Sequence, residues 1–416
     1  MGYKFNPFTS TLDIAGSGGA STPAVFTTVG FSDADYICDG TADDVQIQQA
    51  IDAVETAGGG IVFIKEGTYS ISAPLVISLG KYLTLEGSGW DTILVAVNAL
   101  DDNVIEFNPP SSGVWARFAN FKIDGNGPNQ STAGNCIYAF GALQCIFENM
   151  WITQPWQNGL FIYQDGNGGT GHHSRIFNCL FDEGDNSNGG DGRALRIEAN
   201  DEVSVINCDF ESNGRSGASE PNHIYDLSGL NHFIGNHFVA GQTGIKLQGH
   251  HSRAIGNTFD GTLNHSIRVN GNRNIIVANN IFNPGIGSGS ADFDGVFVDN
   301  VTNNIISNNS ILSDNTGSRS GINFANGATT NTAIGNDISE QGSGYGTGEI
   351  IPGTGNNIFL NTGYASDITV PDEAYGSGWN ASLEVPTKNA VYDKIETISA
   401  GSGITEALAI AYAVAL

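Results

Sequence analysis

The sequence predicts an all-β fold, a single-stranded right-handed parallel β-helix with an N-terminal capping helix. Two observations predict it: a short phrase that recurs along the chain, and an alternation of apolar and polar residues within each repeat. The phrase joins Asn or Gly to a large apolar residue and returns every 21 to 29 residues. Such a period is typical of a solenoid, whose repeats bury their apolar faces by stacking on one another. The nine copies are NFKI, NMWI, NCLF, NCDF, GNHF, GNTF, NNIF, NNSI and GNDI, and they end at Ile123, Ile152, Phe181, Phe210, Phe238, Phe259, Phe282, Ile311 and Ile338.

Each repeat is expected to contain a strand, a bend, a second strand and a loop. The second strand is visible as GLFIY at 159–163, ALRIE at 194–198 and GIKLQG at 244–249. The alternative solenoid, a leucine-rich horseshoe, needs leucines at fixed offsets and a helical stretch in each repeat. This region is instead rich in β-branched and aromatic residues and is punctuated by Asn and Gly, which favours β-strands.

An asparagine ladder is expected at the bend between the two strands. In the later repeats an Asn lies two residues before the large apolar residue, and stacked coils place such side chains about 4.8 Å apart. They can then hydrogen-bond to one another and satisfy polar groups that would otherwise be buried without partners. The ladder residues expected are Asn236, Asn257, Asn280, Asn309 and Asn336.

Composition restricts the partners of the chain. The 416 residues include 16 Lys and Arg against 43 Asp and Glu, a formal net charge of −27, which argues against binding nucleic acid. The five cysteines lack the spacing of a zinc site and are expected to be reduced core residues. No signal peptide opens the chain and no apolar run is long enough for membrane insertion, so we expect synthesis in the cytoplasm and release without export.

Residues 33–94 hold the N-terminal cap and a family resemblance. DGTADDVQIQQAID has apolar positions suited to an amphipathic helix, with Asp43 or Asp44 as its cap and Gly58 to Gly60 at its end. AGGGIVFIKEGTYSIS and LTLEGSGWDTIL follow. This order of turn, helix and strands resembles the opening of the pectate-lyase-like superfamily found in phage tailspikes and polysaccharide depolymerases. The resemblance implies a β-helix that acts on or binds polysaccharide.

Both ends of the chain resemble viral tail proteins. YKFNPFTSTLDIAG resembles short N-terminal segments of tail proteins, and VPTKNAVYDKIETI at 385–398 resembles a phrase near the C-termini of tail fibres. The resemblance implies a homotrimer on the virion tail, attached through its N-terminus, in an extracellular location. The expected division is 1–32 for particle attachment, 33–117 for the capping helix and first coils, 118–362 for the β-helix coils, and 363–416 for trimerisation or a linker.

The outward positions of the second strands form two rows that we expect to carry the chemistry. Arg196, Lys246 and Arg268 fall on one row of a chain with few basic residues, and the rows predict a polar strip flanked by aromatic residues. The first row is Phe161, Arg196, Asp226, Lys246, Arg268, Phe297 and Asn323, and the second is Tyr163, Glu198, Ser228, Gln248, Asn270, Asp299 and Ala325.

Two reactions fit these residues, and a third possibility is binding alone. Glycoside hydrolysis needs two carboxyl groups across the scissile bond, and Glu198 with Asp226 are the expected pair. Asp209 and Glu211 could supply the pair instead. Elimination from a uronate needs cations to neutralise the acid group, which Arg196, Lys246 and Arg268 would provide. An ordinary solvated face with weak salt bridges is the structural alternative.

Trp156, Tyr163 and Tyr225 are the aromatic residues expected to stack on sugars, because flat rings with a polar edge suit a sugar's apolar face. No metal site is expected, although the loop DEGDNSNGGDGR could bind calcium through Asp182, Glu183, Asp185 and Asp191.

The leading hypothesis is therefore a viral tailspike that binds and depolymerises a cell-surface polysaccharide, by hydrolysis rather than elimination. Its rivals are a non-enzymatic receptor-binding spike, a polysaccharide lyase and a structural or adhesive β-helical surface protein.

Overall fold

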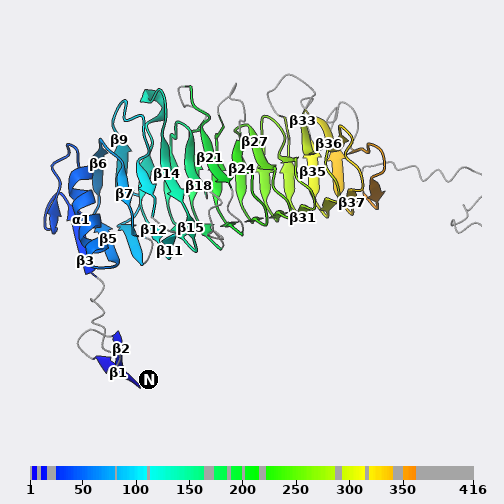
Figure 1. The fold of residues 1–416 in the computed structure, drawn as a ribbon. Helices are drawn as coiled ribbons and strands as arrows, with labels where there is room; N and C mark the ends of the chain where they lie inside the picture. The colour runs from blue at the N-terminus through cyan, green and yellow to red at the C-terminus, as the bar shows by residue number, and fades with distance from the viewer. Residues whose placement is uncertain are drawn as a thin grey trace, which may run out of the picture. The chain divides into compact units, whose positions relative to one another are not determined.

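In a computed structural model, the described chain is a right-handed stack of β-strand coils, and a helix closes one end of the stack (Figure 1). The structure describes residues 2–6, 11–15, 25–79, 82–109, 113–163, 173–184, 189–198, 202–214, 222–285, 293–313, 318–340 and 350–361. The chain divides into two units, 1–363 and 364–416. The second unit, and with it the expected trimerisation segment, lies outside the described residues, as do residues 1, 7–10 and 16–24 of the expected attachment segment.

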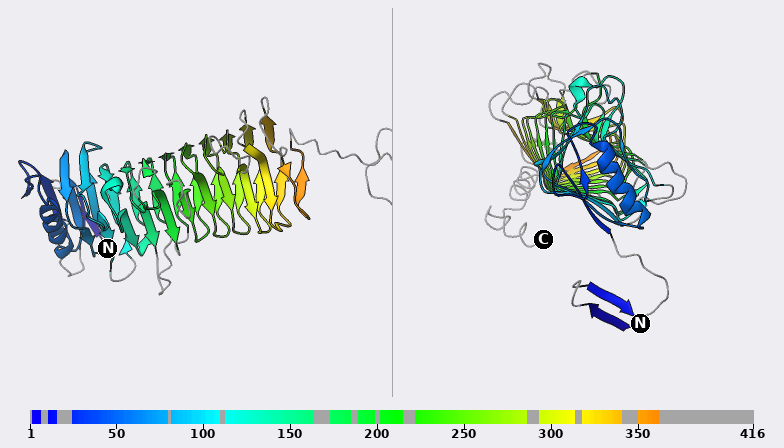
Figure 2. Two further views of the ribbon diagram at one scale, coloured as in Figure 1. Left: turned by 90° about the horizontal axis from the view of Figure 1, so that it is seen from above. Right: turned by 90° about the vertical axis from the view of Figure 1, so that its left-hand side faces the viewer.

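Three long sheets form the sides of the coils, and all their strand pairs are parallel. The expected all-β parallel β-helix is confirmed. Figure 2 shows the strands stacked coil on coil, with the helix across the N-terminal end. The fourteen-stranded sheet contains β4 (Tyr36–Ile37), β3 (Val25–Gly30), β5 (Gly60–Ile64), β8 (Leu83–Gly87), β12 (Arg117–Ala119), β16 (Ile146–Glu148), β19 (Arg175–Phe177), β22 (Ser204–Ile206), β25 (His232–Ile234), β28 (Arg253–Ile255), β31 (Ile275–Val277), β34 (Ile305–Ser307), β37 (Thr332–Ile334) and β40 (Asn357–Phe359).

Two eleven-stranded sheets complete each coil. The β7–β39 sheet contains β7 (Leu75–Ile77), β10 (Ile105–Phe107), β14 (Asn135–Phe140), β18 (Asn158–Tyr163), β21 (Arg193–Glu198), β24 (Asn222–Asp226), β27 (Thr243–Leu247), β30 (Ile267–Val269), β33 (Phe293–Asp299), β36 (Ser318–Ala325) and β39 (Ile350–Ile351). The β6–β38 sheet contains β6 (Gly67–Ile71), β9 (Thr92–Ala96), β13 (Lys122–Asp124), β17 (Trp151–Thr153), β20 (Leu180–Asp182), β23 (Asp209–Glu211), β26 (His237–Val239), β29 (Thr258–Asp260), β32 (Asn280–Phe282), β35 (Ser310–Ser313) and β38 (Asp337–Glu340).

The remaining described elements are smaller. They are the antiparallel pair β1 (Gly2–Asn6) and β2 (Thr11–Ala15), the parallel pair β11 (Gly113–Val114) and β15 (Ala142–Leu143), the 3-10 turn Gly127–Asn129, and the helix α1 (Asp44–Thr56). Within the described ranges no helix has the length and apolar character needed to cross a membrane.

The core is a column of apolar side chains that repeats coil by coil. Phe181, Phe210, Phe238 and Phe259 stack with ring centroids 5.0, 4.8 and 4.6 Å apart and planes within 7° of parallel. All four are at most 1% exposed. The stacking follows from the sequence, because each ring occupies the inward position of the same strand in consecutive coils. The five cysteines are free and buried, as expected.

The capping helix begins and ends where the sequence predicts, but its two aspartates act differently. α1 spans Asp44–Thr56 and buries Ile47, Ile51 and Val54 against the first coils. Asp43 makes no side-chain capping bond. Its carboxylate instead accepts hydrogen bonds from the backbone N–H groups of Gly40 and Ser70, at 2.8 Å each, and so ties the turn before the helix to β6.

The asparagine ladder is confirmed with one correction. Asn236, Asn257, Asn309 and Asn336 are buried, and each side-chain oxygen accepts hydrogen bonds from the coil before it. The fifth member is Asn279 and not Asn280, because Ile281 rather than Phe282 points inward on β32. A second ladder, which the sequence analysis missed, joins Asn231, Ser252, Asn274, Asn304, Asn331 and Asn356 at the bend between the β7–β39 sheet and the fourteen-stranded sheet.

The ladder predicts that the loss of stability on substitution of an asparagine depends on its position. Asn279→Ala removes a side chain that accepts bonds from the N–H and Nδ2 of Asn257 and donates to Asn309 and to the carbonyl oxygen of Ala254. Because these buried partners lose bonds, we expect the free energy of unfolding in urea to fall by about 2–4 kcal/mol. Asn280→Ala, one residue away and exposed, is the matched control and should change it by less than about 0.5 kcal/mol. Equal costs for the two would contradict the ladder.

Candidate functional site

The strongest candidate site is the outer face of the β7–β39 sheet, labelled β14, β18, β21 and β24 in Figure 1. Outward side chains of neighbouring strands stack in two rows, which we call the strip. The first row is Tyr138, Phe161, Arg196, Tyr225, Lys246, Arg268, Phe297 and Asn323. The second lies two residues further along each strand and includes Phe140, Tyr163, Glu198, Gln248, Asn270 and Asp299.

Asp226 is not on the strip, so the expected register was wrong by one residue in this coil. Arg196 pairs with Tyr225 on one side, and Tyr225 pairs with Lys246 on the other, so Tyr225 takes the outward position. Asp226 is 0% exposed. Its carboxylate accepts hydrogen bonds from Ser252 Oγ at 2.6 Å and from Asn231 Nδ2 at 2.8 Å, inside the second asparagine ladder. Burial raises its pKa, although these hydrogen bonds oppose the rise.

The three expected cations do lie together on the strip. Arg196 Nη2 bonds Glu198 Oε2, and Arg268 Nη2 bonds Asp299 Oδ2 at 3.0 Å. Each guanidinium keeps its Nε buried and without a hydrogen-bond partner among the described residues, and the same holds for Asn270 Oδ1. Unpartnered buried polar atoms are uncommon, and here they gather on one face. The strip therefore has unused hydrogen-bonding capacity beside its positive charges.

Tyr225 has a different environment from the one expected of a sugar-stacking ring. Arg193 Cζ and Lys246 Nζ lie 5.2 and 4.8 Å from its ring centroid, and the residue is only 8% exposed. Its hydroxyl donates to Gln248 Oε1 at 2.9 Å. The ring thus holds the neighbouring cations in place through cation–π contacts.

Aromatic side chains cover the N-terminal part of the strip. Tyr163 lies 5.8 Å from Phe140 and 5.7 Å from Phe161, and Tyr138 lies 5.4 Å from Phe161. Arg196 packs over the Phe161 ring at 4.7 Å. Tyr138 and Phe140 were missed, although the alternation in NCIYAF one coil earlier carries the signal. These four half-buried rings form a surface on which a sugar ring can stack.

Trp156 lies in the loop before β18, at the edge of this surface, and is partly buried. Its carbonyl oxygen accepts a hydrogen bond from the N–H of Gly192 at 3.1 Å, and a Cβ on Gly190 would come within 1.7 Å of that oxygen. The glycine loop therefore packs directly on the backbone of Trp156.

The fold separates the expected pair Glu198 and Asp226 and keeps Asp209 and Glu211 together on another sheet. Glu198 is on the strip, whereas Asp209 and Glu211 are exposed on β23 of the β6–β38 sheet, a different side of the coil. The second row holds one other carboxylate, that of Asp299. It lies four coils from Glu198, about 19 Å away. Hydrolysis requires two carboxyl groups within about 10 Å. Glu198 therefore has no such partner on the described strip, while Asp209 and Glu211, two residues apart on one strand, lie about 6.6 Å apart by backbone spacing.

A buried ion pair borders the C-terminal part of the strip. Arg319 bonds the carboxylate of Asp294, which also accepts from Ser320 Oγ at 2.6 Å and Asn323 Nδ2 at 3.1 Å. His265 stacks on Phe297, with centroids 4.5 Å apart and planes 4° apart. Burial lowers the pKa of His265 to about 4, so its ring is neutral at pH 7. Asp294 and Arg319 lie on the paired strands β33 and β36, at a register shift, and His265 precedes β30. No sequence signal marked this group.

The described carboxylates of the loop that could bind calcium each accept a hydrogen bond from a different side chain. Asp182 accepts from Trp151 Nε1 at 3.0 Å, Glu183 from Gln154 Nε2 at 2.6 Å and Asp191 from Arg193 Nη1 at 2.8 Å. Asp185 lies outside the described residues. In the part of the chain that the structure describes, no group of three or more His, Cys, Asp or Glu side chains is placed to hold a metal ion. Calcium binding there stays a prediction.

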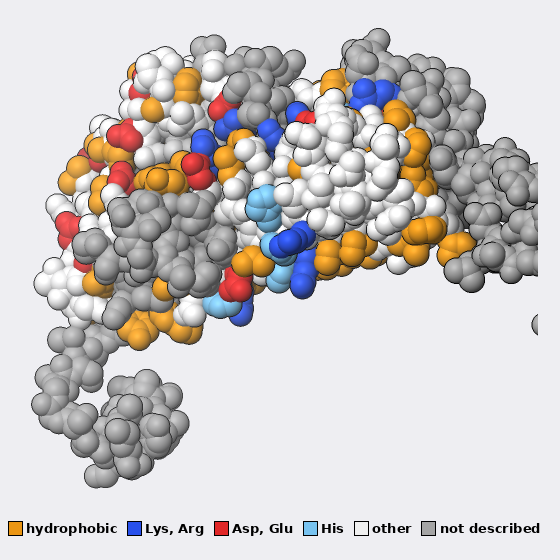
Figure 3. Space-filling view, turned by 45° about the vertical axis from the view of Figure 1, so that its right-hand side comes forward, with side chains coloured by type: hydrophobic (Ala, Val, Ile, Leu, Met, Phe, Trp, Pro, Cys, Tyr) orange, Lys and Arg blue, Asp and Glu red, His pale blue; other side chains and the backbone are white. Residues whose placement is uncertain are grey.

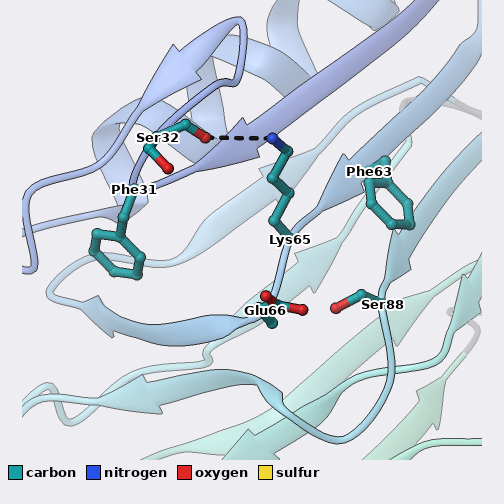
Figure 4. Close-up of a pocket in the computed structure, with 6 residues that line it drawn as sticks. All are labelled: Phe31, Ser32, Phe63, Lys65, Glu66 and Ser88. Atoms are coloured by element: carbon teal, nitrogen blue, oxygen red, sulfur yellow. Dashed lines mark hydrogen bonds between the residues drawn. The ribbon is translucent and has the colours of Figure 1, made fainter.

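A pocket of about 280 Å³ lies at the capped end, lined by Phe31, Ser32, Phe63, Lys65, Glu66 and Ser88 (Figure 4). Lys65 Nζ donates to the carbonyl oxygens of Ser32 and Asp33 at 3.3 and 2.5 Å. Its ammonium group thus fastens the N-terminal loop, which indicates a structural role.

Comparison with known proteins agrees with this architecture. Residues 33–186 match the family model described as rhamnogalacturonase A/epimerase, pectate lyase-like. Over these residues the chain is similar to pectate-lyase-like β-helix proteins. Residues 185–391 match a second model, described as periplasmic copper-binding protein (NosD). No curated protein matches the sequence.

Solved structures resemble this chain in fold at low sequence identity. The N-terminal fragment of gene product 12 of bacteriophage Phi29 is 14% identical, with 78% of this chain and 60% of that chain covered and a TM-score of 0.59. The tailspike of E. coli bacteriophage HK620, solved with a hexasaccharide, is 14% identical, with 79% and 64% covered and a TM-score of 0.56. The A-module of the Azotobacter vinelandii mannuronan C-5 epimerase AlgE6 is 13% identical, with 79% and 97% covered and a TM-score of 0.51. The chain thus spans less than two thirds of the two phage proteins' length.

The position of Asp226 predicts a pH-dependent stability. In the unfolded chain its carboxyl titrates near 3.8, and burial raises the folded pKa above that value. The folded state therefore holds the proton more tightly, and its stability falls as pH rises from about 4 through the folded pKa. Asp226→Asn removes this loss. The free energy of unfolding of Asp226→Asn minus that of the wild type should rise over this pH window and then level off, as urea unfolding at several pH values would show.

Asp299→Asn is the control with the opposite sign. Burial acts to raise the pKa of Asp299, but hydrogen bonds from Asn326, Arg268 and Asn270 outweigh it and leave the pKa lowered. Its carboxylate stabilises the fold above pH 3.8 and loses this effect as pH falls through the folded pKa. The free energy of unfolding of Asp299→Asn minus that of the wild type should therefore fall as pH rises. A flat profile for Asp226→Asn would show that solvent reaches this carboxylate.

Proposed function

We propose that the strip binds an extended acidic polysaccharide on the surface of a host cell and cleaves it. The observation that carries the proposal is the row of Arg196, Lys246 and Arg268, which lies beside stacked aromatic rings on an otherwise strongly acidic protein. Successive coils repeat at about 4.8 Å, so an extended polymer along the strip would meet cations at several sugars. Cations attract carboxylates, and the aromatic rings of the N-terminal coils would stack on sugar faces.

We further propose that the protein is part of a viral tail. Two of the structural neighbours are phage proteins, one of them named as a tailspike and solved with a hexasaccharide, and another neighbour is named as an epimerase of mannuronan. These names, together with the resemblance of 1–32 and 385–398 to tail proteins, support an extracellular virion location, attachment through the N-terminus and a homotrimer.

Elimination fits the strip better than hydrolysis does. In elimination a base removes the proton α to a uronate carboxyl group and the neighbouring glycosidic oxygen leaves, while cations stabilise the charge that develops on the carboxylate. Arg196, Lys246 and Arg268 supply three cations, whereas Glu198 is the single expected acid that remains there. Hydrolysis by Asp209 and Glu211 on the β6–β38 sheet is the second candidate, because their spacing suits two carboxyl groups.

Mass spectrometry of a host capsular or O-antigen polysaccharide after incubation with the protein tests the proposal. Unsaturated fragments would establish elimination at the cation row. Fragments that carry one added water would establish hydrolysis and direct mutagenesis to Asp209, Glu211 and Glu198. Intact polymer that binds would leave a receptor-binding spike, and intact polymer that does not bind would overturn the proposal.

The cation row also predicts a graded loss of affinity. Arg196→Gln, Lys246→Gln and Arg268→Gln should each weaken binding of the recognised oligosaccharide about tenfold, because each removes one charge-assisted contact. Arg175→Gln, an exposed arginine on the fourteen-stranded sheet that forms no ion pair with a described residue, is the matched control and should leave affinity unchanged. Isothermal titration calorimetry measures both. An equal loss in the control would show a general charge effect.

A further inference from the structure

A short phrase, GHHSR, occurs twice in the chain, at 171–175 and 249–253, and it ends each time in an arginine that begins a strand. Arg175 begins β19 and Arg253 begins β28, and both side chains are exposed on the fourteen-stranded sheet. The histidine two residues before each arginine has a positive φ, of 68° and 64°, and the serine between them is buried. The repeated phrase therefore directs two arginines outward from equivalent positions of the coil, three coils apart.

The two arginines border one pocket on the outer face of this sheet. The pocket has a volume of about 330 Å³, and Ser204 and His232 line it from the two coils between the arginines. Leu230, which is 42% exposed, adds an apolar side chain to the lining. His173 Nδ1 and Glu202 Oε2, also in the lining, lie 3.1 Å apart. We call this site the basic pocket.

The arginines of the basic pocket have no carboxylate partner among the described residues, and Arg273, one coil further along, has none either. Each of the other described arginines is bonded to a carboxylate; these are Arg117, Arg193, Arg196, Arg268 and Arg319. Figure 3 shows His side chains gathered with Lys or Arg side chains on one face of the molecule. In a chain of net charge −27, guanidinium groups without a partner indicate a site for an anion from outside the chain.

The donors of the basic pocket suit a phosphate group better than a carboxylate. A phosphate monoester carries nearly two negative charges at pH 7 and has three oxygens that accept hydrogen bonds from several directions. Guanidinium groups bind phosphate oxygens through pairs of parallel hydrogen bonds, and the Ser204 hydroxyl and the His232 ring can donate to the oxygens that remain. A planar carboxylate would occupy one guanidinium and leave the other donors unused.

We propose that the basic pocket binds the phosphate group of a phosphorylated sugar. Leu230 favours a sugar phosphate over free phosphate, because it offers the sugar an apolar contact. Small-molecule sites begin at roughly 300 Å³, so the volume of the pocket suits a single sugar with its phosphate.

This site is separate from the strip, which lies on the β7–β39 sheet and is proposed to bind carboxylates. A glycan of the host surface as the source of the phosphorylated sugar rests on the proposed function. Binding of the sugar phosphate itself does not, so a small phosphorylated sugar tests the pocket whether or not the strip binds a polysaccharide.

Isothermal titration calorimetry of the full chain with glucose 6-phosphate, inorganic phosphate and glucose tests the proposal. We expect glucose 6-phosphate to bind about fivefold more tightly than inorganic phosphate, because of the apolar contact, and glucose not to bind. Arg253→Gln should weaken glucose 6-phosphate binding about tenfold, because it removes one charge-assisted contact. Lys122→Gln, which removes one positive charge from the β6–β38 sheet, is the matched control and should leave the affinity unchanged.

Three results of the titrations would overturn the proposal. An equal loss in Lys122→Gln would show a general effect of charge. Inorganic phosphate that binds as tightly as glucose 6-phosphate would make the pocket a site for free phosphate. No binding of either phosphate would show that the arginines do not form an anion site.

His232 provides a second readout inside the pocket. Burial lowers its pKa, Arg253 lowers the pKa further and Glu202 opposes the change. Arg175 and His173 are the other titratable groups of the lining. A bound phosphate adds negative charge beside the His232 ring, so its pKa should rise when glucose 6-phosphate is present, as titration of the ring signals by NMR would show. An unchanged pKa while glucose 6-phosphate binds would place the phosphate elsewhere and overturn the proposal.

Discussion

The fold depends on the in-register stacking of one coil on the next. Parallel backbone hydrogen bonds join equivalent strands at about 4.8 Å, and buried asparagine side chains satisfy the backbone at two bends of the later coils. Because the register is shared by all three sheets, one residue type placed at one position of the repeat becomes a row on the surface. The strip is a product of this constraint.

The repeat made the fold predictable, and the variation in coil length limited prediction of the site. Nine copies of one phrase indicate a solenoid, and DGTADDVQIQQAID indicates its cap, because both patterns are local. Which residues of a strand point outward cannot be predicted from such a local pattern. YDLSG fits two alternations that differ by one residue, so the sequence predicted Asp226 at the outward position that Tyr225 occupies in the structure. For the same reason the sequence predicted Asn280 in the ladder, where the structure has Asn279. Arg319 and Asp294 meet at a register shift between β33 and β36, and His265 joins them from the segment before β30, so no periodicity encodes their contact.

The outer faces of the sheets divide the surface chemistry. The β7–β39 sheet gathers Arg196, Lys246 and Arg268 with aromatic rings, the β6–β38 sheet carries the acids Asp209 and Glu211, and the fourteen-stranded sheet exposes apolar residues such as Ile206 and Ile334. Three of the 16 Lys and Arg residues lie on one row of the strip, which is how a chain of net charge −27 can present cations to an acidic polymer.

Hydroxyl-radical footprinting with a bound oligosaccharide tests the central claim, that the strip is the sugar-binding face, most directly. The account predicts slower oxidation of Tyr138, Phe161 and Tyr163 when sugar is bound. Trp90 and Trp151, whose rings lie 5.5 Å apart by the β6–β38 sheet, should be unchanged and serve as the internal reference. Protection of the tryptophans with no change on the strip would contradict the account and move the site to the other face.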